Sequence, residues 1–127
     1  MINVYHKRYV DSTTRKVYNW LERWGLEYNV IDDTTLTEDI IKNILKVSDL
    51  GFDEILVNKN RVSGLNREIY SKYKLDSLST KQLIQLILTY PTLLKTPIIY
   101  DEKKLFTGFD NYELRKFLPR VRERQNA

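Results

Sequence analysis

The sequence predicts a single α/β domain: a strand-helix-strand unit, then a helical middle, then a strand-strand-helix unit. Three observations support this fold class. An apolar helical stripe separates two short strands near the amino end, capping patterns open further helical stripes in the middle, and a hairpin pattern follows near the carboxyl end. With 127 residues, of which 42% are hydrophobic and 30% charged, the chain has the composition of one globular domain with a modest core.

The first strand is expected at Ile2–Tyr5, followed by a helix from Ser12 to Trp24. Apolar side chains recur along this helix at helical spacing: Val17, Trp20, Leu21 and Trp24. Asp11 or Ser12 is expected to cap its amino end, because a short polar side chain there accepts hydrogen bonds from free backbone amides. Gly25 is suited to end the helix in a left-handed conformation.

The second strand is expected at 27–31, parallel to the first because a helical crossover joins them. The pattern Thr35-Leu36-Thr37-Glu38 resembles a capping box and predicts a helix that ends before Gly51. Its apolar stripe consists of Ile40, Ile41, Ile44, Leu45 and Val47. Residues 53–57 are consistent with a short further helix, and the tyrosine-rich stretch 69–78 has a periodicity too weak to assign.

The last third predicts a helix, a hairpin and a short final helix. Ser79-Thr80-Lys81-Gln82 is a second capping pattern, and the dense apolar run after it predicts a helix that ends near Tyr90. Residues 97–106 alternate as two strands around a polar turn. Asp110 is expected to cap a helix that Pro119 stops.

The composition excludes several classes of function. The chain has no cysteine and a single histidine, His6, so it can form no disulfide, thiolate nucleophile, cysteine-type zinc site or histidine cluster. Its formal net charge of +4 is weak for a protein that reads nucleic acid alone. No apolar run is long enough for a membrane span or secretory signal, so we expect a cytoplasmic protein that does not associate with membranes.

Three stretches carry a resemblance to a known family, and they lie at 14–21, 44–55 and 93–120. In them the chain resembles Spx-type transcriptional regulators, within the arsenate-reductase-like branch of the thioredoxin superfamily. The resemblance covers nearly the whole chain. It implies one domain over residues 1–127 with a thioredoxin-like sheet, a helical insertion at roughly 33–94 between its halves, and a polar tail at 120–127.

In that family the first helix begins with a Cys-x-x-Cys switch or a nucleophilic cysteine. The corresponding residues here are Asp11, Ser12, Thr13 and Thr14. The reductases also hold an oxyanion with arginines, and the matching positions here include Lys59 and Thr96. Lysine lacks the planar fork with which arginine binds an oxyanion. A Thr14 hydroxyl would need a base, for which the only candidate is His6, and a cap is the more frequent role of an aspartate at position 11. We therefore expect no catalytic residues, metal or cofactor, and a cis Thr96–Pro97 peptide.

The resemblance also implies a surface that docks on RNA polymerase. Its candidate residues are Lys46, Gly51, Phe52, Asp53 and Glu54. In the family this surface binds the carboxyl-terminal domain of the polymerase α subunit. Two simpler roles stay open: Gly51 could be the carboxyl cap of the preceding helix, and Phe52 could pack inward.

The resulting hypothesis is a transcriptional regulator, not an enzyme, that binds the polymerase α subunit without redox control. The first alternative is a non-catalytic protein that competes with a cysteine-bearing relative for polymerase or for proteolytic factors such as a protease adaptor. A degenerate arsenate-reductase-like enzyme is the second. The basic end of the chain, Arg115 to Arg124, either contacts promoter DNA non-specifically in the complex or is a solvated tail.

Overall fold

A four-stranded sheet organises the computed structural model, which describes residues 1–119. Its strands are β1 (Ile2–Tyr5), β2 (Tyr28–Ile31), β3 (Ile98–Tyr100) and β4 (Leu105–Thr107), in the order β2-β1-β3-β4. β1 pairs with β2 in parallel, and β3 is antiparallel to both β1 and β4. The α/β class and the thioredoxin-like strand arrangement are confirmed.

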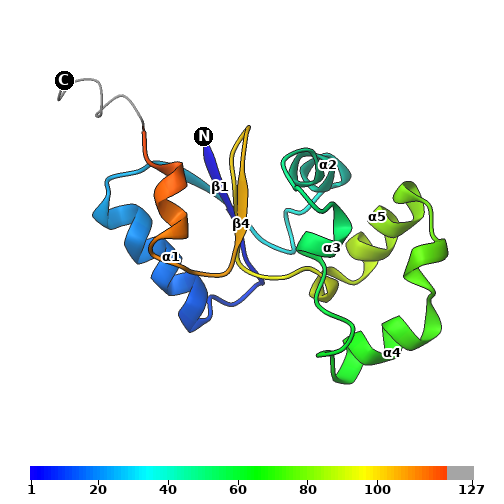
Figure 1. Cartoon of the computed structure of the whole chain (residues 1–127). Helices are drawn as coiled ribbons and strands as arrows, with labels where there is room; N and C mark the ends of the chain where they lie inside the picture. Colours follow the sequence, from blue (N-terminus) through cyan, green and yellow to red (C-terminus); the bar gives the residue numbers. More distant parts are fainter. Residues whose placement is uncertain (120–127) are drawn as a thin grey trace.

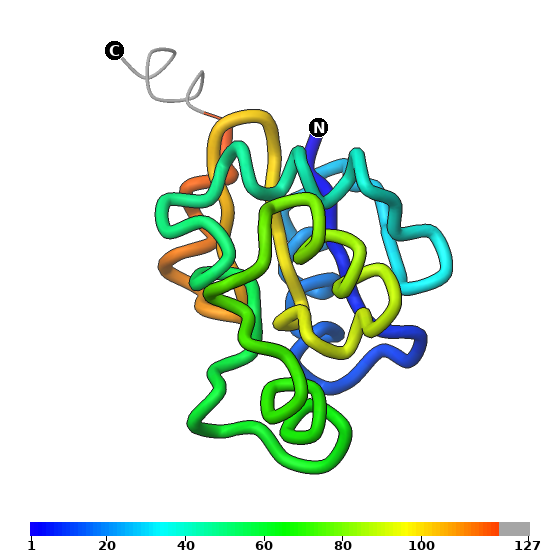
Figure 2. Tube along the Cα trace, turned by 90° about the vertical axis from the view of Figure 1, so that its right-hand side faces the viewer, coloured from blue at the N-terminus to red at the C-terminus, as the bar shows by residue number. Residues whose placement is uncertain are grey.

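Helices cover both faces of the sheet (Figure 1). One face carries α1 (Ser12–Arg23) and the 3₁₀ helix η3 (Glu113–Phe117). The other face carries the helical middle, whose elements are α2 (Glu38–Lys46), α3 (Phe52–Ile55), α4 (Gly64–Lys72), η1 (Leu75–Ser77), α5 (Thr80–Thr89) and η2 (Pro91–Leu93). Viewed from that side, the helical middle lies in front of the strands, with α4 at its lower end (Figure 2).

Each face has its own apolar core, because successive strand residues point to opposite sides. Ile98 packs with the helical middle and Ile99 packs with α1 and η3, and both are fully buried. Trp20 is the largest buried side chain on the α1 face, where its indole N–H donates to Asn111 Oδ1 at 2.7 Å. The sheet therefore separates two cores that share few side chains.

The capping patterns predict the starts of these helices correctly, except at α2. Ser79 and Gln82 form the complete capping box of α5, and Asp11 caps α1. The cap of α2 is Thr37, whose hydroxyl accepts from Ile40, and the expectation that Thr35 opens the helix is wrong. Thr35 instead closes a turn with Asp32. Its amide and its hydroxyl both hydrogen-bond to the Asp32 carboxylate, so they do not cap the helix.

Two further parts of the chain differ from their sequence patterns. The stretch 69–78, whose periodicity is too weak to assign, contains the end of α4 and the 3₁₀ turn η1. Gly64, the first residue of α4, has a positive φ of 55°. The apolar stripe of α4 is weak, and Ile69 is its only buried residue. The final helix is η3, a 3₁₀ helix; Asp110 accepts from the amides of Tyr112 and Glu113 just before it. The Thr96–Pro97 peptide is cis, as expected.

Candidate functional site

The loop where the resemblance predicts a lost thiol site lies between β1 and α1. Asp11 Oδ1 accepts from the Thr14 amide at 2.8 Å, and this backbone hydrogen bond holds the pKa of Asp11 below its ordinary value. Ser12 is exposed, whereas Thr14 is buried at 1% exposure. The aspartate is thus a helix cap, and Thr14 offers little surface to a substrate.

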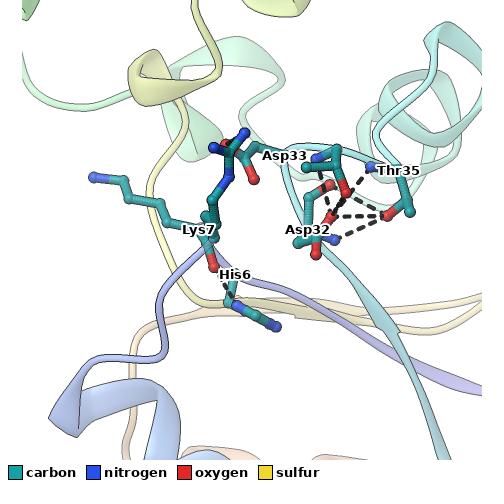
Figure 3. Close-up of polar contacts among 7 residues, drawn as sticks. His6, Lys7, Asp32, Asp33 and Thr35 are labelled. Atoms are coloured by element: carbon teal, nitrogen blue, oxygen red, sulfur yellow. Dashed lines mark hydrogen bonds and ion pairs between the residues drawn. The ribbon is translucent and has the colours of Figure 1, made fainter.

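His6 is held away from a catalytic role by its own contacts. Its Nδ1 donates to the Lys7 carbonyl (Figure 3). Its ring meets the Tyr18 ring edge-on, with the ring centroids 5.8 Å apart. Within residues 1–119 no hydrogen bond joins the imidazole to the hydroxyls of residues 12–14. His6 is instead engaged by the Lys7 carbonyl and the Tyr18 ring.

Asp32 and Asp33 follow β2 and lie beside the β1–α1 loop in Figure 3. Asp32 Oδ1 accepts from the hydroxyl and amide of Thr34, and the hydroxyl bond is the main reason that the pKa of Asp32 is lowered. Arg8 Nη2 lies 3.8 Å from Asp33 Oδ2. This acidic pair was missed by sequence reasoning; its signal was the Asp-Asp-Thr-Thr run directly after a strand. It builds a turn, and in residues 1–119 no group of three His, Cys, Asp or Glu side chains is arranged to hold a metal.

The positions that match the oxyanion site do not come together around α1. Lys59 lies on the exposed loop after α3 and lines a groove in the helical middle. Neither Thr96 nor any residue of 11–14 lines that groove. Thr96 is half-buried before the cis peptide. No arginine fork and no shared anion pocket are formed by these residues.

Residues 46–54, the segment predicted to dock on polymerase and called the docking segment below, contain a turn that one carboxylate organises. Glu54 Oε1 accepts from Ser48 Oγ at 2.8 Å, from the Asp49 amide at 2.8 Å and from the Leu50 amide at 3.3 Å. Ser48 Oγ also lies 2.9 Å from the Gly51 carbonyl oxygen. Three donors on one carboxylate oxygen stabilise the turn.

Gly51 occupies a backbone conformation that suits glycine. Its φ is +63° and its ψ is −137°, and no atom lies within 4 Å of the place where a Cβ would be. The interpretation of Gly51 as the carboxyl cap of the preceding helix is wrong, because Val47 caps α2 and Gly51 instead begins α3. The backbone at position 51 is therefore open to close approach by another molecule.

The side chains around Gly51 differ in exposure. Lys46 and Asp53 are exposed, whereas Phe52 is half-buried and packs against the core of the helical middle. Leu50 is 71% exposed. It was not among the predicted site residues, although a leucine between Asp49 and Gly51 in a turn was the available signal. Leu50, not Phe52, is the exposed apolar side chain of the docking segment.

Replacing Glu54 with alanine is expected to loosen this turn. Three donors would lose their acceptor, and we expect a fall in the free energy of unfolding of about 1–3 kcal/mol. Asp53→Ala is the matched control, since Asp53 is exposed and should change stability by less than about 0.5 kcal/mol. Urea unfolding of both variants, with amide hydrogen exchange at residues 49 and 50, measures this. Equal stability of the two variants would contradict the role given to Glu54.

Asp11→Ala is expected to lower the free energy of unfolding by about 0.5–2 kcal/mol at pH 7. The pKa of Asp11 is lower in the folded protein than its ordinary 3.8, so its stabilising effect is full above that value and is lost as the pH falls through the folded-state pKa. The difference from the unmutated protein should therefore shrink below about pH 4. Urea unfolding at several pH values tests this, with Ser12→Ala as the control; a difference that persists at low pH would rule out the charged cap.

The fold and the site define a class: a cysteine-free, thioredoxin-like α/β protein with a capped first helix and a turn before α3 that Glu54 holds together. The family model of the ArsC family matches residues 10–117. The chain belongs to the ArsC family.

Relatives by sequence include transcriptional regulators by name, and one similar solved structure is described as a possible arsenate reductase. The global transcriptional regulator Spx of Listeria monocytogenes is 39% identical over 86% of this chain and 81% of its own length. Spx of Streptococcus pneumoniae is 34% identical over 90% and 84%. The solved structure of a possible arsenate reductase from Streptococcus mutans superposes with a TM-score of 0.70 at 26% identity, covering 92% of this chain and 98% of that one. The resemblance to Spx-type regulators is confirmed, and these homologues indicate a global transcriptional regulator.

None of the helices in the described part of the chain combines the length and the hydrophobicity needed to cross a bilayer.

Proposed function

We propose that the protein regulates transcription by docking on the carboxyl-terminal domain of the RNA polymerase α subunit through residues 46–54, without redox control and without catalysis. The main support is the turn before α3, where Leu50 is exposed, Gly51 leaves the backbone open, and Glu54 fixes both. A rigid turn with an exposed apolar side chain binds with little loss of conformational freedom. Spx relatives that are regulators by name support the same function.

Independence from redox control rests on the composition. The chain has no cysteine and therefore no thiolate to oxidise. Asp11 accepts a hydrogen bond from the Thr14 amide and acts as a helix cap. The absence of an arginine fork and of a base beside Thr14 argues against reduction of an oxyanion. We therefore propose that the amount of protein, and not its oxidation state, controls its output.

The direct test is binding of the purified protein to the purified α carboxyl-terminal domain. Isothermal titration with and without a thiol reductant should give the same Kd in both conditions. No measurable binding would refute the docking hypothesis, and a reductant-dependent Kd would refute redox independence. Arsenate reduction assays with glutathione or a protein thiol donor should show no turnover; turnover would favour the enzyme.

A second candidate function shares the surface but not the output. The protein could occupy the polymerase or a protease adaptor and displace a cysteine-bearing relative, since the fixed turn needs no thiol to bind. Transcription in vitro with the protein alone distinguishes the two: a change in promoter use supports the regulator, and an effect seen only with the relative present supports the competitor.

Contact with promoter DNA is a further part of this proposal. Arg115 is exposed on η3, whereas Lys116 Nζ already donates to the Leu105 carbonyl at 2.7 Å. The tail arginines at 120, 122 and 124 lie outside the described residues. A contribution from phosphate contacts would make promoter binding by the complex weaken with salt.

A further inference from the structure

The helical middle contains a groove that neither the docking segment nor the former thiol loop explains. It has a volume of about 1040 Å³ and lies between α3 with its following loop on one side and α4, η1 and the start of α5 on the other. Its apolar lining includes Leu56, Tyr70, Tyr73, Leu75 and Leu78. This volume is at the upper end of the range for small-molecule sites, which is about 300–1,000 Å³.

One hydrogen bond fixes a wall of the groove. The Tyr70 hydroxyl donates to the Val57 carbonyl at 2.7 Å and ties α4 to the loop after α3. The Leu93 carbonyl accepts from the Val57 amide at 2.9 Å, which anchors the same loop to the segment before β3. The groove is thus held open by contacts between its own walls.

Charge identifies the kind of ligand. Three lysines line the groove, Lys59, Lys74 and Lys95, together with two carboxylates, Asp53 and Asp76. None of the three amines has an ion-pair partner or a hydrogen bond in the described part of the chain. The side chains that line the groove therefore carry a formal net charge of +1.

We propose that this groove binds an amphipathic anion, a small molecule with an apolar body and one carboxylate or phosphate head. The tyrosines and leucines would cover the apolar body, and the three amines would bind the head. An anionic head near the three amines should bind more tightly than a neutral one, because the two carboxylates do not cancel the positive charge of the three lysines.

The test uses the full chain and dodecanoate, below its micelle concentration, followed by amide chemical shifts. Saturable shifts at residues lining the groove, such as Asn58 and Tyr73, are expected with dodecanoate and with dodecyl phosphate, and their relative Kd values identify the preferred head. Acetate, which lacks the body, and dodecylammonium, which has the opposite charge, should each bind at least about tenfold more weakly.

Variants separate the site from non-specific charge. Lys59→Gln with Lys74→Gln and Lys95→Gln should weaken dodecanoate binding about tenfold or more. The matched control is Lys7→Gln with Lys16→Gln and Lys103→Gln, three exposed lysines outside the groove, which should leave the Kd unchanged. Equal loss in both triple variants, shifts spread over the α1 face, or tight binding of dodecylammonium would each overturn the proposal. A DNA duplex that shifts the same residues as strongly would assign the surface to nucleic acid instead.

The groove and the docking segment share Leu50, Phe52 and Asp53. We therefore expect saturating dodecanoate to change the Kd for the α carboxyl-terminal domain severalfold, a link that rests on the proposed function. If the domain does not bind at all, the proposed function fails while the dodecanoate titration still decides the site. If both ligands bind with unchanged affinities in the presence of the other, the link is overturned.

Discussion

Gly51→Arg is expected to abolish detectable binding to the polymerase α carboxyl-terminal domain. Its side chain would project into open space, because nothing lies within 4 Å of the Cβ position, and it would occupy the surface where the partner approaches. A residue at the centre of an interface can account for about 2 kcal/mol or more, which is about thirtyfold in Kd, and a large side chain adds a clash to that loss. Isothermal titration measures it.

Gly25 offers a matched control for the strain of the substitution. Its φ is also +63°, it also has nothing within 4 Å of a Cβ, and it lies after α1 on the opposite face of the sheet. Gly25→Arg should therefore reduce stability by about the 1–2 kcal/mol that a positive φ costs, as Gly51→Arg does. Binding should persist in Gly25→Arg. Equal loss of binding in both variants would show that strain, and not the docking surface, is responsible.

Truncation of either central isoleucine of β3 is expected to lower the free energy of unfolding by about 2–5 kcal/mol. Ile98 and Ile99 are fully buried, one in each core, so each alanine variant leaves a cavity on a different face of the sheet. For a domain that is stable by about 5–15 kcal/mol, this loss is a large part of the total. Urea unfolding followed by circular dichroism measures it.

Val30→Ala provides the control on the same sheet. Val30 is 53% exposed on the edge strand β2, so its truncation should change the free energy of unfolding by less than about 0.5 kcal/mol. A second readout follows tryptophan fluorescence, since Trp20 belongs to the core that contains Ile99. Ile99→Ala should alter the native emission, and Ile98→Ala should leave it nearly unchanged. The reverse pattern would contradict the assignment of the two isoleucines to separate cores.

The sequence was sufficient to predict elements whose signals are local. The cap at Asp11, the capping box at Ser79 and the hairpin around residues 101–104 depend on side chains a few positions apart. The start of α4 could not be predicted in the same way, because it begins at Gly64 and buries only Ile69. Burial of Ile69 and the long-range hydrogen bonds from Asn66 to the Thr92 carbonyl and from Tyr70 to the Val57 carbonyl tie that helix to the rest of the helical middle.

The sequence was enough to predict which residues belong to the candidate site, but not which atoms they contact. Glu54 was expected as a polar flank, but its role as a shared acceptor depends on Ser48 and two backbone amides folding back toward it. The exposure of Leu50 follows from the same turn. Lys59 shows the reverse case: the resemblance implies an oxyanion position for it, whereas in the fold it lines a groove with Lys74 and Lys95. Convergence of residues distant in sequence is a property of the tertiary fold.

The two cores on opposite faces of the sheet have a consequence for how the protein can evolve. Asp11 and Thr14 lie on α1, whereas Gly51 and Glu54 lie in the helical middle across the strands, so mutations at one pair change few contacts of the other. Effects of residues that share no partners are close to additive. Loss of a thiol at the start of α1, which the resemblance implies, would thus need no compensating change in the turn before α3, and selection could act on each half of the molecule separately.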